Sequence, residues 1–188
     1  MPTRVKRPAL FLDRDGVINA LPPHRYVARW EEFRFLSGVL SSLRRLRRAG
    51  WRVVVLSNQA GVGRGLVSHS QLREITRKMQ DAVRRAGGRI DAVFYCVHKP
   101  EAYCACRKPK TGMIRRACRR LAIDPANSFV VGDNVTDIQM GRSAGCTTIL
   151  VLTGMTPRSA LRKLSTRPNH VSRNLPEAVR WIFRKGIR

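Results

Sequence analysis

The sequence has few acidic residues and few aromatic residues. Only 12 of the 188 residues are Asp or Glu, against 37 Lys or Arg, so the formal net charge is +25. This excess attracts polyanions and makes nucleic acid a partner to consider. Aromatic residues make up 6% of the chain and do not alternate with the basic runs, which argues against a stacking surface for single strands. We therefore expect most arginines to lie on solvated helix faces.

Long apolar segments are also absent. No apolar run approaches the roughly 18 residues of a membrane-spanning helix, and the residues before Asp13 hold no secretory core. We expect a cytoplasmic protein without a membrane partner. The five cysteines, an odd number, fit metal ligands and buried thiols better than a disulfide framework. The length predicts one domain over residues 1–188, and we expect a monomer.

Short β-rich runs alternate with segments of helical spacing. One helix is expected between Ser37 as N-cap and Gly50 as stop, and another after a capping box of Ser68 and Gln71. Two more helices are expected over residues 111–122 and after Pro176. This alternation predicts a parallel α/β sheet. The five runs read as strands are residues 9–12, 53–56, 92–95, 129–131 and 148–151.

Polar side chains follow four of the predicted strands. Because ligands bind beyond the carboxyl ends of parallel strands, we expect these residues to share one site. Asp13 and Asp15 flank Arg14 and point the same way in an extended segment. With Asp133 they form the hard-oxygen environment that Mg²⁺ prefers. A single aspartate after a strand is more often a helix cap or a turn residue. The prediction of a Mg²⁺ site therefore rests on the convergence of these residues from several strand ends.

A second group of ligands lies within eleven residues. Cys96, His98, Cys104 and Cys106 match a closed tetrahedral Zn²⁺ site without a position for catalytic water, so the zinc is expected to be structural. Buried cysteine packing is the alternative. Cys118 and Cys146 are expected to be core thiols, and His24, His69 and His170 surface or packing residues.

Four motifs resemble those of the haloacid dehalogenase superfamily, in chain order. They are DRDGVIN at residues 13–19, SNQ at residues 57–59, Lys108, and GDNVTD at residues 132–137. The zinc loop followed by Arg107 and Lys108 resembles the branch that contains heptose bisphosphate phosphatases and the histidinol-phosphatase domain. The resemblance covers about residues 8–155. It implies a Rossmann-like parallel sheet with helices on both faces. The forty residues between Asp13 and Val53 leave no room for a cap domain.

The resemblance also implies roles for the catalytic residues. Asp13 would be the nucleophile that forms an aspartyl phosphate, and Asp15 the general acid and then the general base. Asp13, the backbone carbonyl of Asp15, and Asp133 would hold Mg²⁺. Ser57 and Lys108 would bind the phosphoryl oxygens, while Asp137 braces the loop or Lys108, or caps a helix. The residues expected to bind substrate are Asn58, Gln59, Arg107, Asn134 and Tyr26.

The implied substrate is a phosphorylated sugar, with the 7-phosphate of D-glycero-D-manno-heptose 1,7-bisphosphate as first choice. Histidinol phosphate is an alternative. A polynucleotide 3′-phosphate is another, because residues 58–65 resemble the loop of those phosphatases, although the zinc ligands argue against it. Departures from the heptose pattern affect the substrate more than the chemistry: residues 21–26 are longer, the zinc loop is short, and Asn134 replaces a common lysine. A non-catalytic, zinc-containing nucleic-acid-binding module is the distant alternative.

Overall fold

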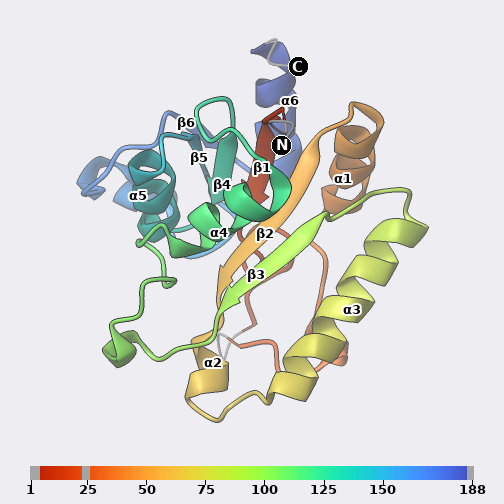
Figure 1. The fold of residues 1–188 in the computed structure, drawn as a ribbon, viewed down its shortest axis with the longest axis vertical. Helices are drawn as coiled ribbons and strands as arrows, with labels where there is room; N and C mark the ends of the chain where they lie inside the picture. The colour runs from red at the N-terminus through yellow and green to blue at the C-terminus, as the bar shows by residue number, and fades with distance from the viewer. Residues whose placement is uncertain (1–4, 23–25, 186–188) are drawn as a thin grey trace.

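Six parallel strands form a single sheet in the order β3-β2-β1-β4-β5-β6 (Figure 1). The computed structural model describes residues 5–22 and 26–185. All five predicted strands are confirmed. The sequence does not predict β6, because three residues with one apolar member carry no periodic signal. The strands are β1 (Ala9–Leu12), β2 (Arg52–Asn58), β3 (Ala92–Cys96), β4 (Phe129–Gly132), β5 (Thr147–Val151) and β6 (His170–Ser172).

Helices cover both faces of the sheet, as the resemblance implies (Figure 1). Alternate strand residues separate the two cores: Leu10 and Leu12 belong to one, and Ala9 and Phe11 to the other. The first core includes α1 (Val39–Arg48), α3 (His69–Arg85) and α6 (Leu175–Arg184), and the second includes α4 (Gly112–Leu121) and α5 (Val135–Ser143). The short elements are α2 (Ala60–Gly63), η1 (Trp30–Glu32), η2 (Pro100–Ala102) and η3 (Arg158–Lys163).

The predicted N-terminal cap is confirmed for one helix and is wrong for another. The Ser68 and Gln71 capping box at the start of α3 is confirmed. The predicted cap at Ser37 is wrong, because Gly38 is the N-cap of α1, at a φ of 74°. A Cβ at Gly38 would also stand 2.7 Å from Pro176 Cγ of α6. The contact with α6 thus selects glycine at this position.

The carboxyl edge of the sheet has no inserted cap in the described ranges. Only η1 and α1 lie between β1 and β2, and only α2 and α3 between β2 and β3. Within residues 5–22 and 26–185, no helix combines the length and the apolarity that crossing a bilayer requires. The polar residues at the strand ends therefore border a cavity that no inserted domain covers among the described residues.

Candidate functional site

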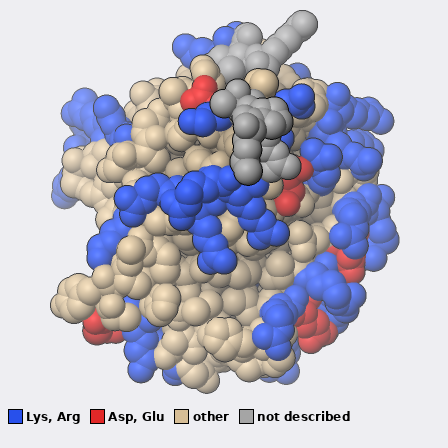
Figure 2. Space-filling view, viewed as in Figure 1, with Lys and Arg blue, Asp and Glu red and all other residues tan. Residues whose placement is uncertain are grey.

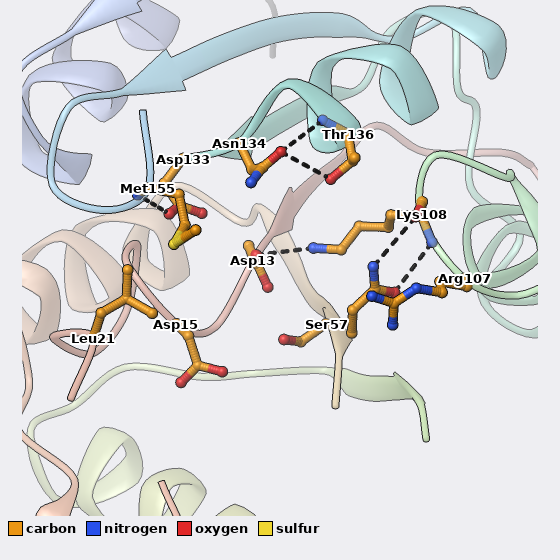
Figure 3. Close-up of a pocket in the computed structure, with 11 residues that line it drawn as sticks. Asp13, Asp15, Leu21, Ser57, Arg107, Lys108, Asp133, Asn134, Thr136 and Met155 are labelled. Carbon is orange, nitrogen blue, oxygen red and sulfur yellow. Dashed lines mark hydrogen bonds and ion pairs between the residues drawn. The ribbon is translucent and has the colours of Figure 1, made fainter. Parts of the chain in front are cut away.

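A cavity of about 330 Å³ lies where the strand ends meet the loops (Figure 3). The carboxylates of Asp13, Asp15 and Asp133 point into this shared space. Most of the predicted site residues line it, although they come from four distant segments. The lining residues are Asp13, Asp15, Leu21, Ser57, Asn58, Arg107, Lys108, Asp133, Asn134, Thr136 and Met155. Among them, Thr136 and Met155 were not predicted, because no charge or motif distinguishes them, whereas Leu21 begins the segment 21–26 that is expected to affect the substrate.

Lys108 is buried at the centre of the site, with 4% of its surface exposed. Its Nζ atom lies 2.9 Å from Asp13 Oδ2 and 2.6 Å from Asp137 Oδ1. It also donates a hydrogen bond to the Leu56 carbonyl, at 3.0 Å. Burial would lower the pKa of Lys108, but the charges of Asp13 and Asp137 raise it above its ordinary value. Lys108 is therefore a fixed cation that joins β1 to the start of α5.

Asp137 fulfils both of its expected structural roles. Besides pairing with Lys108, its carboxylate accepts a hydrogen bond from the backbone N–H of Asn134, at 3.2 Å. The Asn134 side chain accepts one in return from the N–H of Thr136, at 3.1 Å, so α5 begins with a capping box. The loop after β4 is thereby held against Lys108.

Asp133 is buried in a space that excludes larger side chains. Its Oδ2 atom accepts a hydrogen bond from the Met155 N–H, at 2.6 Å. Gly16 has a φ of +79°, and a Cβ there would stand 2.5 Å from the same oxygen. Burial and the charges of Asp13 and Asp137 raise the pKa of Asp133 to about 8. A cation bound beside Asp133 would therefore stabilise the negative charge of this buried carboxylate.

The donor set around Asp133 fits a hard divalent cation. Carboxylate oxygens of Asp13, Asp133 and Asp137 all lie within 4.8 Å of one another. Three carboxylates exceed the single charge of Lys108, and burial raises the pKa of Asp137 to about 6 even beside that lysine. Oxygen donors with excess negative charge are the environment that Mg²⁺ prefers.

Asp15 is held by three neighbouring side chains. Arg14, which is fully buried, donates to both carboxylate oxygens of Asp15 at 3.0 and 3.1 Å. Asn19 Nδ2 donates to Oδ1 at 2.9 Å, and Gln59 Nε2 to Oδ2 at 2.7 Å. The same Gln59 nitrogen donates to Ser57 Oγ, at 3.0 Å. The Asp15 carboxylate therefore has one fixed orientation, which is linked to Ser57.

Asn58 at the end of β2 and Arg107 in the loop before α4 both line the cavity. The Asn58 amide exchanges two hydrogen bonds with the backbone of Lys108, at 3.1 and 3.3 Å. Arg107 Nη1 is buried and has no hydrogen-bond partner among the residues described. A buried guanidinium nitrogen without a partner marks a position where an anion would be stabilised.

Two of the predicted substrate-binding residues do not line the cavity. The Gln59 side chain is buried; its Oε1 accepts a hydrogen bond from Arg14 Nη2 at 3.0 Å, and its Nε2 donates to Asp15. Tyr26 accepts a hydrogen bond from Arg64 Nη1 at 3.0 Å, and its ring packs on Gly61 of α2. Contact of Tyr26 with substrate stays a prediction. His24 lies outside the described residues.

The four soft ligands form one cluster beside the cavity. Cys104 Sγ lies 3.5 Å from the sulfurs of both Cys96 and Cys106, and His98 Nδ1 lies 3.3 Å from Cys106 Sγ. These separations far exceed a disulfide bond. They approach the edge of about 3.8 Å of a tetrahedron with Zn–S bonds of about 2.3 Å.

The thiols of this cluster titrate unequally. Burial and hydrogen bonding to the neighbouring thiols raise the pKa of Cys96 to about 12. Burial opposes ionisation of Cys104 too, but hydrogen bonds from Cys106 and the backbone lower its pKa to about 6. The cluster thus favours a thiolate near neutral pH, the form that binds zinc. Outside it, Cys146 is buried, Cys118 is half-buried, and His170 stacks on Trp181 at 4.4 Å between ring centroids.

Comparison with known proteins identifies close relatives. Residues 105–178 match the family model described as HAD-hydrolase-like. The chain is 34% identical to a D-glycero-beta-D-manno-heptose-1,7-bisphosphate 7-phosphatase of Photorhabdus laumondii, over 93% of this chain and 96% of the relative. It is 43% identical to the enzyme of that name from Bordetella bronchiseptica, over 77% and 80%.

A solved structure agrees with these relatives. The D,D-heptose 1,7-bisphosphate phosphatase of B. bronchiseptica, in complex with magnesium and phosphate, superposes with a TM-score of 0.89. The two proteins share 37% identity, and the superposition covers 95% of this chain and 99% of that one.

The central position of Lys108 yields a stability prediction. Lys108→Met leaves the buried Asp137 and the partly buried Asp13 without their counter-ion. The variant should lower the free energy of unfolding in metal-free buffer by about 3 kcal/mol. Urea unfolding measures this change. Lys110→Met, at an exposed neighbour, is the control and should change stability by less than about 0.5 kcal/mol. Equal stability of both variants would contradict the central role of Lys108.

Proposed function

Since the chain belongs to the D-glycero-D-manno-heptose 1,7-bisphosphate 7-phosphatase family of HAD-like hydrolases, we propose that it hydrolyses the 7-phosphate of that sugar bisphosphate. The observation that carries the proposal is the cavity in which Asp13, Asp15 and Asp133 converge beside buried Lys108. Phosphoryl transfer requires mainly such positioning and charge stabilisation.

Asp13 is the proposed nucleophile. One of its carboxylate oxygens forms a bond to phosphorus while the bond from phosphorus to the sugar oxygen breaks, and Asp15 gives its proton to that leaving oxygen. Water then attacks the aspartyl phosphate, Asp15 takes the water proton, and the Asp13 carboxylate is released with inorganic phosphate. Ser57 and Lys108 bind the transferring phosphoryl oxygens. Both residues line the cavity on the Asp13 side, which supports these roles.

Mg²⁺ is the proposed cofactor, held by Asp13, the backbone carbonyl of Asp15, and Asp133. When bound, the ion supplies positive charge that stabilises the phosphoryl oxygens and separates the carboxylates. The crowding of buried carboxylates, which raises the pKa of Asp133 to about 8, supports this assignment. Asp137 lies within the same cluster but already pairs with Lys108, so its role is to fix that lysine.

Arg14 and Gln59 are proposed to position Asp15 for both proton transfers. Arg14 grips both oxygens of the Asp15 carboxylate, and the Gln59 amide ties Asp15 to Ser57. The Gln59 amide thus contacts both Asp15, which transfers the proton, and Ser57, which binds phosphate. We propose this positioning role for Gln59, whose contact with substrate stays a prediction.

Arg107 is the proposed ligand of the second phosphate. Its buried Nη1 lacks a partner among the described side chains, and a guanidinium binds phosphate through two parallel hydrogen bonds. Recognition of a second phosphate distinguishes a bisphosphate from histidinol phosphate, which carries only one. Asn58 and Asn134 provide further polar contacts on the cavity wall.

Zinc bound by Cys96, His98, Cys104 and Cys106 is proposed to be structural. The four ligand atoms lie within 4.8 Å of one another, and all four positions of a tetrahedron are filled by protein. Cys106 directly precedes Arg107 and Lys108. Fixing this loop by metal would therefore fix the direction of both cations.

A phosphate-release panel tests the substrate. The candidates are both anomers of heptose 1,7-bisphosphate, histidinol phosphate, and a 3′-phosphorylated oligonucleotide, each assayed with and without added Mg²⁺. We expect a heptose bisphosphate to have the highest kcat/KM, turnover to need Mg²⁺, and Asp13→Asn to lower kcat at least about 1,000-fold. A preference for the oligonucleotide, or activity that survives Asp13→Asn, would overturn the proposal.

Burst kinetics test the positioning of Asp15. With 4-nitrophenyl phosphate the leaving group needs no proton, so Arg14→Lys and Gln59→Ala should retain a nitrophenol burst of about one per enzyme. Steady-state turnover, which needs Asp15 as base, should fall about 10- to 100-fold, as in Asp15→Asn. Gln80→Ala on α3 is the control and should match the parent protein. A burst that slows in parallel with turnover, or no effect at all, argues against this role.

Zinc content tests the structural metal. Cys104→Ser should lose bound zinc and lower the midpoint of thermal unfolding by at least about 5 °C, because the loop loses its cross-link. Cys118→Ser, outside the cluster, should retain both properties. Metal analysis and calorimetry give the two readouts. Full zinc content with unchanged melting in Cys104→Ser would exclude the assignment.

A further inference from the structure

The few acidic residues are distributed unevenly. Four of the 12 lie in or beneath the cavity. On α3, other acids neutralise basic neighbours: Asp81 pairs with Arg77 and Arg84, and Glu74 pairs with Lys78. Helix α4 contains no acidic residue. Its exposed face consists of four arginines, for which no ion pair is found in the described part of the chain: Arg115, Arg116, Arg119 and Arg120.

These arginines continue into a basic cleft. A hollow of about 580 Å³ at the end of α4 is lined by four arginines, Arg7, Arg52, Arg89 and Arg120, and by one acid, Asp91, which pairs with Arg89 at 2.8 Å. We call these seven arginines the α4 band. In Figure 2 a continuous blue stripe crosses the middle of the face, over the position of α4 in Figure 1.

The α4 band extends away from the catalytic cavity. Arg7, Arg52 and Arg89 lie at or just before the amino ends of β1, β2 and β3, whereas the cavity lies at the carboxyl ends. A ligand on this end of the band would leave the cavity open. The band is therefore separate from the phosphatase site.

Helix α4 has like-charge pairs that no acidic residue relieves, whereas on α3 the pair of Arg73 and Arg77 is relieved by an acid. Arg115 and Arg119, like Arg116 and Arg120, stand four residues apart, where like charges destabilise a helix. On α3 the same spacing places Arg77 beside Asp81. The apolar residues of α4 keep it folded, because Met113, Ile114 and Ala117 are buried in the core. Its outer face consequently presents concentrated, unneutralised positive charge.

We propose that the α4 band binds the sugar–phosphate backbone of nucleic acid without reading the base sequence. Every cation in the band is arginine, whose planar guanidinium binds phosphate in a bidentate way. Successive arginines in each row are about 6 Å apart along the helix axis, close to the separation of neighbouring phosphates in a strand.

The composition of the band favours nucleic acid over other polyanions. The four arginines of α4 offer no amide or carboxylate to read base edges, and the one carboxylate at the hollow, Asp91, already pairs with Arg89 and accepts a hydrogen bond from the Val53 N–H. Binding therefore depends on phosphate charge. The inward-facing apolar residues of α4 are buried in the core and cannot insert into lipid. In this respect the helix differs from an interfacial membrane anchor.

The test compares two charge-matched variants. One carries Arg→Gln at positions 115, 116, 119 and 120 on α4, and the control carries Arg→Gln at positions 73, 77, 84 and 85 on α3. Both lose four positive charges, so a difference between them reports location and not net charge. Binding of a fluorescent 30-base-pair duplex of arbitrary sequence is measured by anisotropy at several salt concentrations, beside phosphate release by each variant.

We expect the α4 variant to bind at least 10-fold more weakly than the α3 variant. The magnitude of the slope of log affinity against log salt should also fall by about 3.6, since each of the four lost phosphate contacts contributes about 0.9. Phosphate release should stay unchanged in both, which separates this inference from the proposed phosphatase function.

Three results would overturn the proposal. Equal losses in the two variants would indicate net charge alone. Tighter binding to phosphatidylglycerol vesicles than to the duplex would indicate a membrane partner, and equal competition by polyglutamate would exclude recognition of phosphate. Circular dichroism melting verifies that both variants fold. If the α4 variant unfolds, two double variants repeat the comparison: Arg119→Gln with Arg120→Gln on α4, and Arg84→Gln with Arg85→Gln on α3. The expected change in slope is then about half as large.

Discussion

The pairing of Lys108 with Asp13 and Asp137 is the interaction on which the catalytic site depends. Asp13 follows β1, Lys108 lies in the loop before α4, and Asp137 lies in α5; the three side chains meet in a largely buried space at the cavity floor. Unpaired charges in such a space are strongly destabilising. This cation therefore stabilises the convergence of the strand ends. Because two carboxylates share one lysine and a third lies beside them, the same arrangement also leaves excess negative charge for a divalent cation.

Two supports hold the residues that flank this centre. On one side, Arg14 and Gln59 orient Asp15 and connect it to Ser57. On the other side, the cysteine and histidine cluster precedes Arg107 and Lys108, and Asn58 holds the backbone of Lys108. The proposed chemistry uses few residues, whereas their positions depend on a larger buried network. Since no cap domain is inserted in the described residues, this buried network is what holds the catalytic residues in position.

Much of the site could be predicted from sequence, because strand ends in a parallel sheet must meet at one edge. The positions of Asp13, Ser57, Lys108 and Asp133 follow from that rule. The position of Gln59 does not, because its direction depends on the buried guanidinium of Arg14, whose charge in the sequence resembles that of any surface arginine. Short elements such as β6 are likewise set by the tertiary pairing with β5 and not by a local pattern.

The central claim is that the carboxylate beside Lys108 carries the phosphoryl group between the two halves of the reaction. Trapping this intermediate tests the claim most directly. The enzyme is mixed with Mg²⁺ and heptose 1,7-bisphosphate, quenched during turnover, and treated with borohydride, which reduces an aspartyl phosphate to homoserine. Peptide mass spectrometry should then find homoserine at position 13. Reduction at another aspartate, or none during rapid turnover, would contradict Asp13 as the nucleophile.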